Sequence, residues 1–395
     1  MLTAVVAVSF TACGGRSEHA KKLNIDTAVS INIWYQDDAY TSYLDYIAQQ
    51  FHKANEFITV NPVKVEENNL LDAVYNGSIA QNNVADVYLM EASDMQRAYL
   101  MGLTAENDAY TQYYSQKHFP VTAVNAACYE GKLYGYPVTF HTAVMVYNKK
   151  YTTAPENFEQ IEAFLNSYQV TDENKDVNMI VGWDSQDLWT NYAFGGSYVD
   201  NGGAQGEEAE SDVQTEALKA AMTEYAALQN TFGIVDKTQE EYKQMFINNQ
   251  LIYTILDSTQ LADLNASGVD YGICAVPGAK TGFGTQSLSD TILAMVNPYS
   301  ENTDTAKAVA QAISYDYADL LEKDTGYISA RTDVADKNKK VLYQPLYEVY
   351  AKSDSYAKYI GADEFYVRYS ILLHNIWKGE DLNESVDAFI KAVSR

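Results

Sequence analysis

The sequence predicts an α/β fold organised as two domains. The chain has 395 residues, more than one ordinary hydrophobic core accommodates, so two domains are expected. Near the N-terminus, apolar segments of strand length alternate with segments of helical periodicity in the order β-α-β-α-β. That order predicts a parallel sheet with helices on both faces. Hydrophobic residues make up 47% and charged residues 20% of the chain, the balance of a folded protein rather than a disordered one.

Five elements make up this first pattern. Residues 29–36 are typical of a strand, and residues 40–54 of a helix, because apolar side chains recur there at helical spacing. A second strand (60–67), a second helix (70–83) and a third strand (85–90) follow. Ligands of such sheets bind beyond the carboxyl ends of the strands. The polar residues at two of those ends are therefore candidate ligand contacts: Gln36, Asp37, Asp38, Glu91, Ser93 and Asp94.

The next pattern is a stretch over residues 131–151 that reads as two apolar strands joined by a polar break at 139–142. Phe140 and His141 lie inside the break. The second piece is continuously apolar, which fits a strand buried on both faces. Two interpretations stay open at this point: a kink within a core, or a joint that directs Phe140 and His141 toward a ligand.

Aromatic and acidic residues provide candidates in the second half of the chain. Trp183 and Trp189 stand beside Asp184 and Asp187 in a polar, loop-like segment, where ligand contact is favoured over core packing. Asp257 ends an apolar strand at 251–256 and is either a ligand contact or a loop cap. By contrast, the positions of Trp34 within a strand and Trp377 within the last helices favour the core.

The remaining elements are read from the same signals. Apolar spacing predicts a helix that stops at Gly233, and a second helix that turns into the strand ending at Asp257. Two more strands, at 269–276 and 290–296, precede a helix at 304–321 and a helical C-terminus from 341 onward.

Composition excludes several classes of function. The formal net charge of −26 argues against nucleic acid and anionic lipid surfaces, and suits a neutral or cationic ligand better than an anionic one. Three cysteines give no disulfide framework, so Cys128 and Cys274 are expected to be free. No histidine stands at metal-ligand spacing with another, and no phosphate-binding or nucleophile motif is present. We therefore expect no metal and no cofactor.

The N-terminus resembles a bacterial lipoprotein signal. Residues 1–12 are apolar and uncharged, small residues follow, and Cys13 stands where such signals are cleaved and lipidated. A start codon upstream would supply the basic residues that usually open such a signal. Residues 13–27 are polar and include two glycines, which fits a tether. We expect a protein outside the cytoplasm, held on the cell membrane by lipid on Cys13.

Several segments together resemble one family. "INIWYQDD", "ADVYLMEASDMQRAYLMGLTAEN", "GKLYGYPVTFHTAVMVYNKK", "FINNQLIYTILDS" and "VDYGICAVPG" occur in this order. They look like the extracellular solute-binding proteins of sugar ABC transporters, the family that includes maltose-binding protein. The resemblance covers the chain from about residue 29 to its end. It implies a periplasmic-binding-protein-like fold, in which two α/β lobes close by a hinge around a ligand in the cleft between them.

The resemblance also implies domain boundaries and site residues. The first lobe would hold 28–142 plus 293–338, and the second 146–290 plus 340–395, so that the break at 139–142 becomes the first crossing, at the cleft floor. Asp38 falls at an acidic residue that bonds sugar hydroxyls, and Ser93 and Asp94 fall at an Asp-Arg pair. His141 replaces a sugar-contacting glutamate, and Tyr366 falls at a stacking tryptophan.

The function that the resemblance implies is that of a monomeric binding protein that is not an enzyme. It would capture a neutral oligosaccharide, malto-oligosaccharide-like or another glycan, and deliver it to the membrane subunits of an ABC permease. Two alternatives stay open. A carbohydrate-active hydrolase would use paired carboxylates, which 53 acidic residues make possible. A binder of a cationic ligand, such as a polyamine or peptide, would exploit the acidic strand ends.

Overall fold

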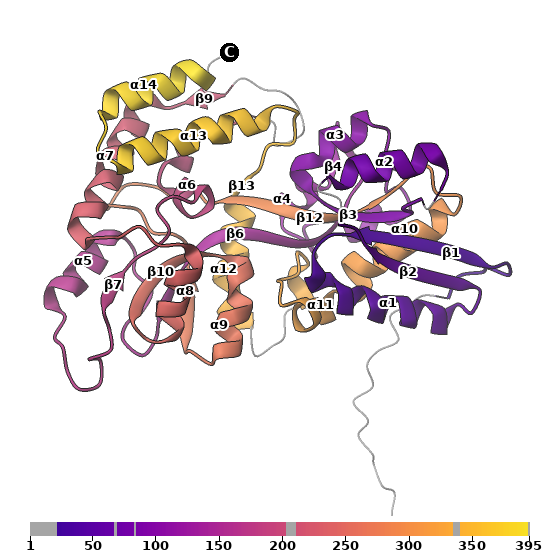
Figure 1. Ribbon diagram of the computed structural model, residues 1–395, viewed down its shortest axis with the longest axis horizontal. Coiled ribbons are helices and arrows are strands. Elements are labelled where there is room, and N and C mark those ends of the chain that lie inside the picture. The colour runs from indigo at the N-terminus through magenta and orange to yellow at the C-terminus, as the bar shows by residue number, and fades with distance from the viewer. Residues whose placement is uncertain (1–21, 67–68, 83, 203–210, 335–339, 394–395) are drawn as a thin grey trace, which may run out of the picture.

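The computed structural model describes residues 22–66, 69–82, 84–202, 211–334 and 340–393. Its helices and strands form two lobes (Figure 1), joined through the middle of the molecule by β6 (Tyr136–Asn148) and β12 (Leu288–Val296). One sheet runs through both lobes in the order β2-β1-β3-β12-β6-β10-β7. The predicted lipoprotein signal at 1–12, with Cys13, lies outside the described residues.

The first lobe confirms the β-α-β-α-β pattern. Strand β1 pairs in parallel with both β2 and β3, so the carboxyl ends of β1 and β3 lie at the same edge of the sheet. Helix α1 forms because Tyr43, Leu44, Ile47 and Phe51 share one face, and all four are buried. The elements of this lobe are β1 (Val29–Tyr35), α1 (Thr41–Ala54), β2 (Ile58–Lys64), α2 (Leu70–Ala80), β3 (Val87–Glu91), α3 (Met95–Leu100), α4 (Val121–Ala126), β4 (Cys128–Tyr129), β5 (Lys132–Leu133), α10 (Thr303–Gln311) and α11 (Ala318–Thr325).

Strand β6 is continuous, so the prediction of two strands separated by a polar break was wrong. Its first half pairs with β12 up to Thr142, and from Ala143 onward it pairs with β10 and β11. The threonines remain in strand geometry because their hydroxyls find partners: Thr139 bonds the Tyr40 hydroxyl (2.6 Å) and Thr142 donates to the carbonyl of Leu288 (2.8 Å). Their β-branched side chains also suit a strand.

The second lobe surrounds the other half of the sheet. Helix α7 ends at Gly233, whose φ of 61° is the left-handed conformation that glycine adopts freely. Helix α8 begins with a capping box between Thr238 and Glu241. The elements are α5 (Phe158–Ser167), β7 (Met179–Val181), α6 (Leu188–Gly196), β8 (Val199–Asp200), β9 (Asp212–Val213), α7 (Thr215–Phe232), α8 (Gln239–Ile247), β10 (Leu251–Asp257), α9 (Leu261–Ser267), β11 (Tyr271–Cys274), β13 (Asp354–Ser355), α13 (Ala362–Trp377) and α14 (Leu382–Val393).

Helix α12 (Lys340–Lys352) lies between the two lobes. The Tyr343 hydroxyl donates to Glu322 of α11 (2.7 Å) and accepts from Asn265 of α9 (2.7 Å), so one side chain connects helices of both lobes. Trp34 and Trp377 are buried in the core as predicted. Cys128 and Cys274 are both free, as predicted. Among the described residues, no helix combines the length and apolarity needed to cross a bilayer.

Candidate binding cleft

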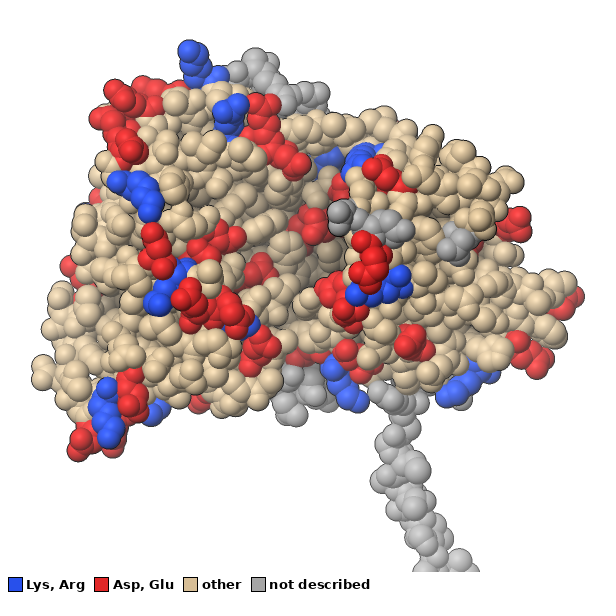
Figure 2. Space-filling model, in the orientation of Figure 1, with Lys and Arg blue, Asp and Glu red and all other residues tan. Residues whose placement is uncertain are grey.

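A cleft separates the two lobes, and acidic side chains gather along it in Figure 2. It has two adjoining compartments. The first compartment measures about 660 Å³ and the second about 510 Å³. Because five residues line both, the compartments are parts of one cleft: Glu91, Asp94, Arg97, His141 and Trp189.

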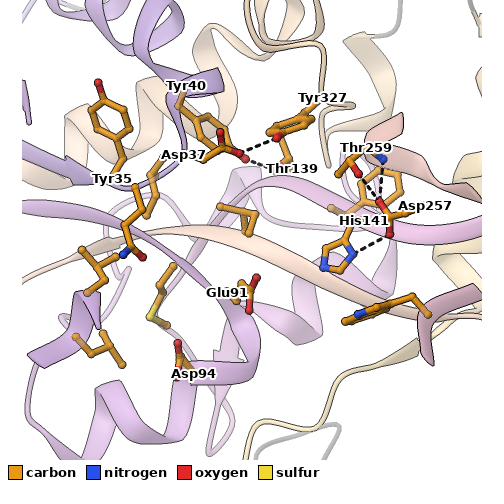
Figure 3. Close-up of a pocket in the computed structure, with 18 of the residues that line it drawn as sticks. Tyr35, Asp37, Tyr40, Glu91, Asp94, Thr139, His141, Asp257, Thr259 and Tyr327 are labelled. Atoms are coloured by element: carbon orange, nitrogen blue, oxygen red, sulfur yellow. Dashed lines mark hydrogen bonds and ion pairs between the residues drawn. The ribbon is translucent and has the colours of Figure 1, made fainter. Parts of the chain in front are cut away.

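The first compartment is built at the ends of strands, as Figure 3 shows. Gln36 and Asp37 follow β1, and Glu91 ends β3, so the parallel pairing brings them to one edge. Across the cleft, Asp257 ends β10 of the second lobe. Seven residues that the sequence singled out therefore line this compartment at or just beyond strand ends, or on the strand between them: Gln36, Asp37, Glu91, Asp94, Phe140, His141 and Asp257.

His141 and Asp257 form an ion pair at the cleft floor. His141 Nδ1 lies 3.0 Å from Asp257 Oδ2, and their side chains are 19% and 12% exposed. Burial by itself lowers the pKa of His141, but the hydrogen bond and charge of Asp257, with the charges of Asp290 and Glu91, raise it to about 9. Burial raises the pKa of Asp257, yet its bonds to His141 and Thr259 bring it below the usual value. The pair is therefore charged at neutral pH.

This ion pair fixes the orientation of the imidazole. Because Nδ1 binds Asp257, the second ring nitrogen points away from it, on the side of Glu91 (Figure 3). Asp257 also accepts from the backbone N–H of Thr259 (2.9 Å) and caps the short helix there. Of the two roles that the sequence left open for Asp257, the cap is present; Asp257 also lines the cleft, and its contact with a ligand stays a prediction.

Two more carboxyl groups of the cleft have raised pKa values. Asp290, near the start of β12, is 4% exposed and accepts from the backbone N–H of Thr291 at 2.6 Å. Burial, followed by the charge of Glu91, raises its pKa. Burial likewise raises the pKa of Asp94. Ser93 lines the second compartment and bonds Asp290. Sequence reasoning missed Asp290, although a carboxylate within an otherwise buried strand is a recognisable signal.

Aromatic rings form one wall of the cleft. The half-buried Trp189 lies 4.4 Å from the ring of His141 and 5.8 Å from that of Tyr356, measured between centroids. Tyr356 in turn stacks on Tyr366 at 3.7 Å with 24° between the planes. Trp189 is the second residue of α6, whose N-cap Asp187 accepts from the backbone N–H of Thr190, so this tryptophan stands on a helix end rather than in a loop.

Tyr366, predicted as a stacking residue of the site, does not line the cleft. It is 2% exposed, and its hydroxyl accepts from the backbone N–H of Ala357 (2.8 Å) and from Asn201 (2.5 Å). The residue lining the cleft is Tyr356, with Tyr366 packed behind it. Sequence reasoning missed Tyr356, whose only local signal is an aromatic side chain in a polar stretch between two helices.

Three further predictions for site residues differ from the structure. Trp183 is fully buried, because the strand β7 directs it into the core, where its Nε1 donates to Asn191 (2.8 Å). Asp184 lines neither compartment; its carboxylate accepts from the backbone N–H groups of Gln186, in the loop before α6, and Gln239, at the start of α8. Asp38 is likewise outside both compartments and pairs with Lys64 at 2.8 Å.

Phe140 lines the first compartment, as predicted from the sequence, but it is only 3% exposed, because its ring stacks on Tyr350 of α12 at 3.8 Å.

Other lining residues come from distant parts of the chain. The Tyr327 hydroxyl donates to Asp37 at 2.6 Å, and its ring meets Tyr40 edge-on at 5.7 Å. Gln239 and Thr259 line the opposite side. These residues carry no local sequence signal, because only the folded topology brings them together. Within the described residues no group of histidine, cysteine and acidic side chains could hold a metal ion.

The arrangement combines flat apolar rings with hydrogen-bond acceptors, which is the chemistry needed to bind a polyhydroxylated ligand between two lobes. The fold and the interlobe cleft are those of a solute-binding protein. The chain belongs to the bacterial extracellular solute-binding protein family, whose model matches residues 46–347. The members of this family bind substrates and are not enzymes.

Known relatives agree with this assignment. The chain is 23% identical over 299 residues to the maltodextrin-binding protein MdxE of Bacillus subtilis (strain 168), covering 71% of this chain and 68% of that protein. Its fold matches an extracellular solute-binding protein of Staphylococcus aureus solved with maltose (TM-score 0.76, 18% identity, 93% and 98% of the two chains). It also matches the maltose-maltodextrin binding protein of Alicyclobacillus acidocaldarius (TM-score 0.73, 16% identity, 93% and 100%). The predicted family and fold class are therefore confirmed.

Proposed function

We propose that this protein captures a neutral oligosaccharide in the cleft and delivers it to the membrane subunits of an ABC importer. The observation that carries the proposal is the aromatic wall of Trp189 and Tyr356, which shares the cleft with Glu91 and Asp94. Aromatic faces cover the C–H surfaces of a pyranose, and carboxylates accept hydrogen bonds from its hydroxyls. The names of the relatives, which bind maltose and maltodextrins, support an α-linked glucose oligomer.

Closure of the lobes would complete the site. We propose that residues 28–142 with 293–338 move as one body, and 146–290 with 340–395 as the other. The ligand contacts of the two bodies would then converge, with Glu91 and Asp94 on one side and Trp189 and Asp257 on the other. A lipid on Cys13 would hold the protein near the permease, and the chain would act as a monomer.

One observation favours a second candidate. The cleft is lined by more carboxylates than cationic groups, with Asp37, Glu91, Asp94 and Asp257 in the first compartment against Arg97 and the His141 imidazolium. Such a field attracts cations. A polyamine or another cationic ligand is therefore the alternative.

A thermal-shift panel followed by calorimetry separates these candidates. The panel contains maltose to maltohexaose, cello- and xylo-oligosaccharides, and spermidine. A ligand at 100 times its Kd stabilises the folded state by about 2.7 kcal/mol, which a midpoint shift reveals. We expect stabilisation by at least one neutral oligosaccharide, with the sugar recovered intact. Stabilisation by spermidine alone, or by no member of the panel, would refute the proposal.

A further inference from the structure

A single segment forms one side of the second compartment. Residues 356–363, called the strap below, comprise the connection from β13 to α13 and the first two residues of α13, and all eight of them line that compartment. In Figure 1 the strap lies between α13 of the second lobe and the α3 and β4 region of the first. It therefore runs along the interlobe space rather than over the outside of either lobe.

Lys358 fastens the strap to the first lobe. Its side chain is 1% exposed, and its Nζ donates to the carbonyl oxygens of Asn125 (2.6 Å) and Cys128 (2.7 Å). Burial lowers the pKa of Lys358 to about 8, with the charges of Cys128 and Asp290 acting in the opposite direction. A buried ammonium is costly unless it is hydrogen-bonded, so these two carbonyls hold Lys358 firmly in place.

Gln96 of α3 adds a second attachment. Its backbone N–H donates to the carbonyl of Lys358 (3.3 Å), and its side-chain oxygen accepts from the backbone N–H of Ile360 (2.5 Å). The side-chain nitrogen of Gln96 donates to the Tyr129 hydroxyl (3.0 Å), which fixes the amide orientation. Four hydrogen bonds from Lys358 and Gln96 thus join the middle of the strap to the first lobe.

The two ends of the strap belong to the second lobe and the connecting sheet. The backbone N–H of Tyr356 donates to the carbonyl of Ser289 (2.8 Å), and its ring stacks on Tyr366. Beyond Gly361 the chain enters α13. The ends of the strap thus lie on the second-lobe side and its middle contacts the first lobe. The strap therefore spans the space between the lobes at the second compartment.

We propose that the strap closes one end of the cleft and makes the second compartment a pocket for the terminal unit of the ligand. The inference rests on the proposed function and adds that the oligosaccharide is recognised by a chain end. Tyr356 offers its ring to the terminal sugar, and its hydroxyl, which donates to Asp363 (2.8 Å), is held in position. Asp94 lines the same compartment, and its carboxylate is an acceptor for sugar hydroxyls.

End-blocked ligands test this geometry. The best-binding oligosaccharide of the panel is compared by calorimetry with two derivatives, one carrying aminobenzamide at the reducing end and one a benzylidene group on the non-reducing terminal unit. We expect one derivative to bind at least 100-fold more weakly and the other within threefold of the parent. Equal binding of both derivatives, or equal loss by both, overturns the chain-end inference and leaves the proposed function standing. Failure of every parent sugar overturns the proposed function itself.

A variant tests whether the weaker binding of one derivative depends on the strap. Gln96→Ala removes the side-chain bond to Ile360, which is one of the two bonds between α3 and the strap, and leaves no buried charge. The matched control, Gln244→Ala, removes an exposed glutamine of α8 that is bonded to Glu240. Gln96→Ala should bind the disfavoured derivative at least tenfold more tightly than the wild type does. Gln244→Ala should leave the affinity ratio of the two derivatives unchanged. An unchanged discrimination in Gln96→Ala, with the variant folded by circular dichroism, refutes the role of the strap.

Discussion

The ion pair at the cleft floor makes a quantitative prediction for Asp257→Asn. The substitution keeps the size of the side chain and removes the charge that faces His141 at 3.0 Å. The pKa of His141 is about 9 in the folded protein, against an ordinary value of 6.5. That difference corresponds to about 3 kcal/mol of stabilisation of the folded state by the imidazolium.

The sign follows from the direction of the pKa change. A histidine whose pKa is raised on folding contributes its full stabilisation below pH 6.5, and loses it as the pH rises through 9. Asp257→Asn removes the charge and the charge-assisted hydrogen bond that contribute most to raising the pKa of His141, so most of this stabilisation should be lost. The free energy of unfolding of the wild type should therefore exceed that of the variant most at pH 6, and this excess should shrink by about 3 kcal/mol toward pH 10.

Urea denaturation of both proteins at pH 6, 8 and 10 measures this excess. An NMR titration reads the pKa of the His141 ring directly, with the signal assigned through His141→Gln. Comparing the two proteins cancels the contributions of other titrating groups, such as Lys358. A wild-type His141 that titrates at or below 6.5, or an excess stability independent of pH, would show that the ion pair does not govern the cleft floor.

Three further predictions follow from burial and backbone geometry. Trp189→Ala should weaken the affinity for the bound sugar by about 1 to 2 kcal/mol with little loss of stability, whereas Trp183→Ala should cost about 3 to 5 kcal/mol of unfolding free energy, as measured in urea. Burial raises the pKa of Asp354 to about 7, so the wild type loses unfolding free energy as the pH rises from 4 through 7. Asp354→Asn should remove up to about 4 kcal/mol of that loss, as measured by urea denaturation across this pH range. Gly233→Ala should destabilise by about 1 kcal/mol, while Gly233→Asn, which tolerates the left-handed conformation, should cost less by thermal denaturation.

The sequence predicted those parts of the fold that depend on local periodicity. The first three strands and the helices between them follow from apolar spacing, and their parallel pairing explains why Asp37 and Glu91 meet at one edge. The sequence predicted a break at 139–142 because polar threonines interrupt the apolar pattern, whereas β6 continues through them. Their hydroxyls are satisfied by Tyr40 and by the carbonyl of Leu288, two partners that only the tertiary structure supplies.

The aromatic residues that line the cleft could not be identified from local sequence alone. Trp183 and Trp189 stand six residues apart beside acidic residues, and nothing in their neighbourhood distinguishes them. The structure separates them because Trp183 follows β7 into the core, while Trp189 stands on the first turn of α6 at the cleft. Tyr356 was missed because a residue more than 160 positions before it, Trp189, completes the wall to which it belongs.

The packing of α12 has a consequence for how the chain unfolds. Residues of the first lobe, such as Leu44 and Val309, share one continuous hydrophobic core with Tyr242 and Leu261 of the second. Tyr343 adds hydrogen bonds to helices on both sides. Each lobe also has a cluster of its own, but because this core is shared, excising one lobe would expose apolar surface that the other normally covers. Despite its two-lobed shape, the molecule should melt as a single cooperative unit, with a ligand in the cleft stabilising all of it at once.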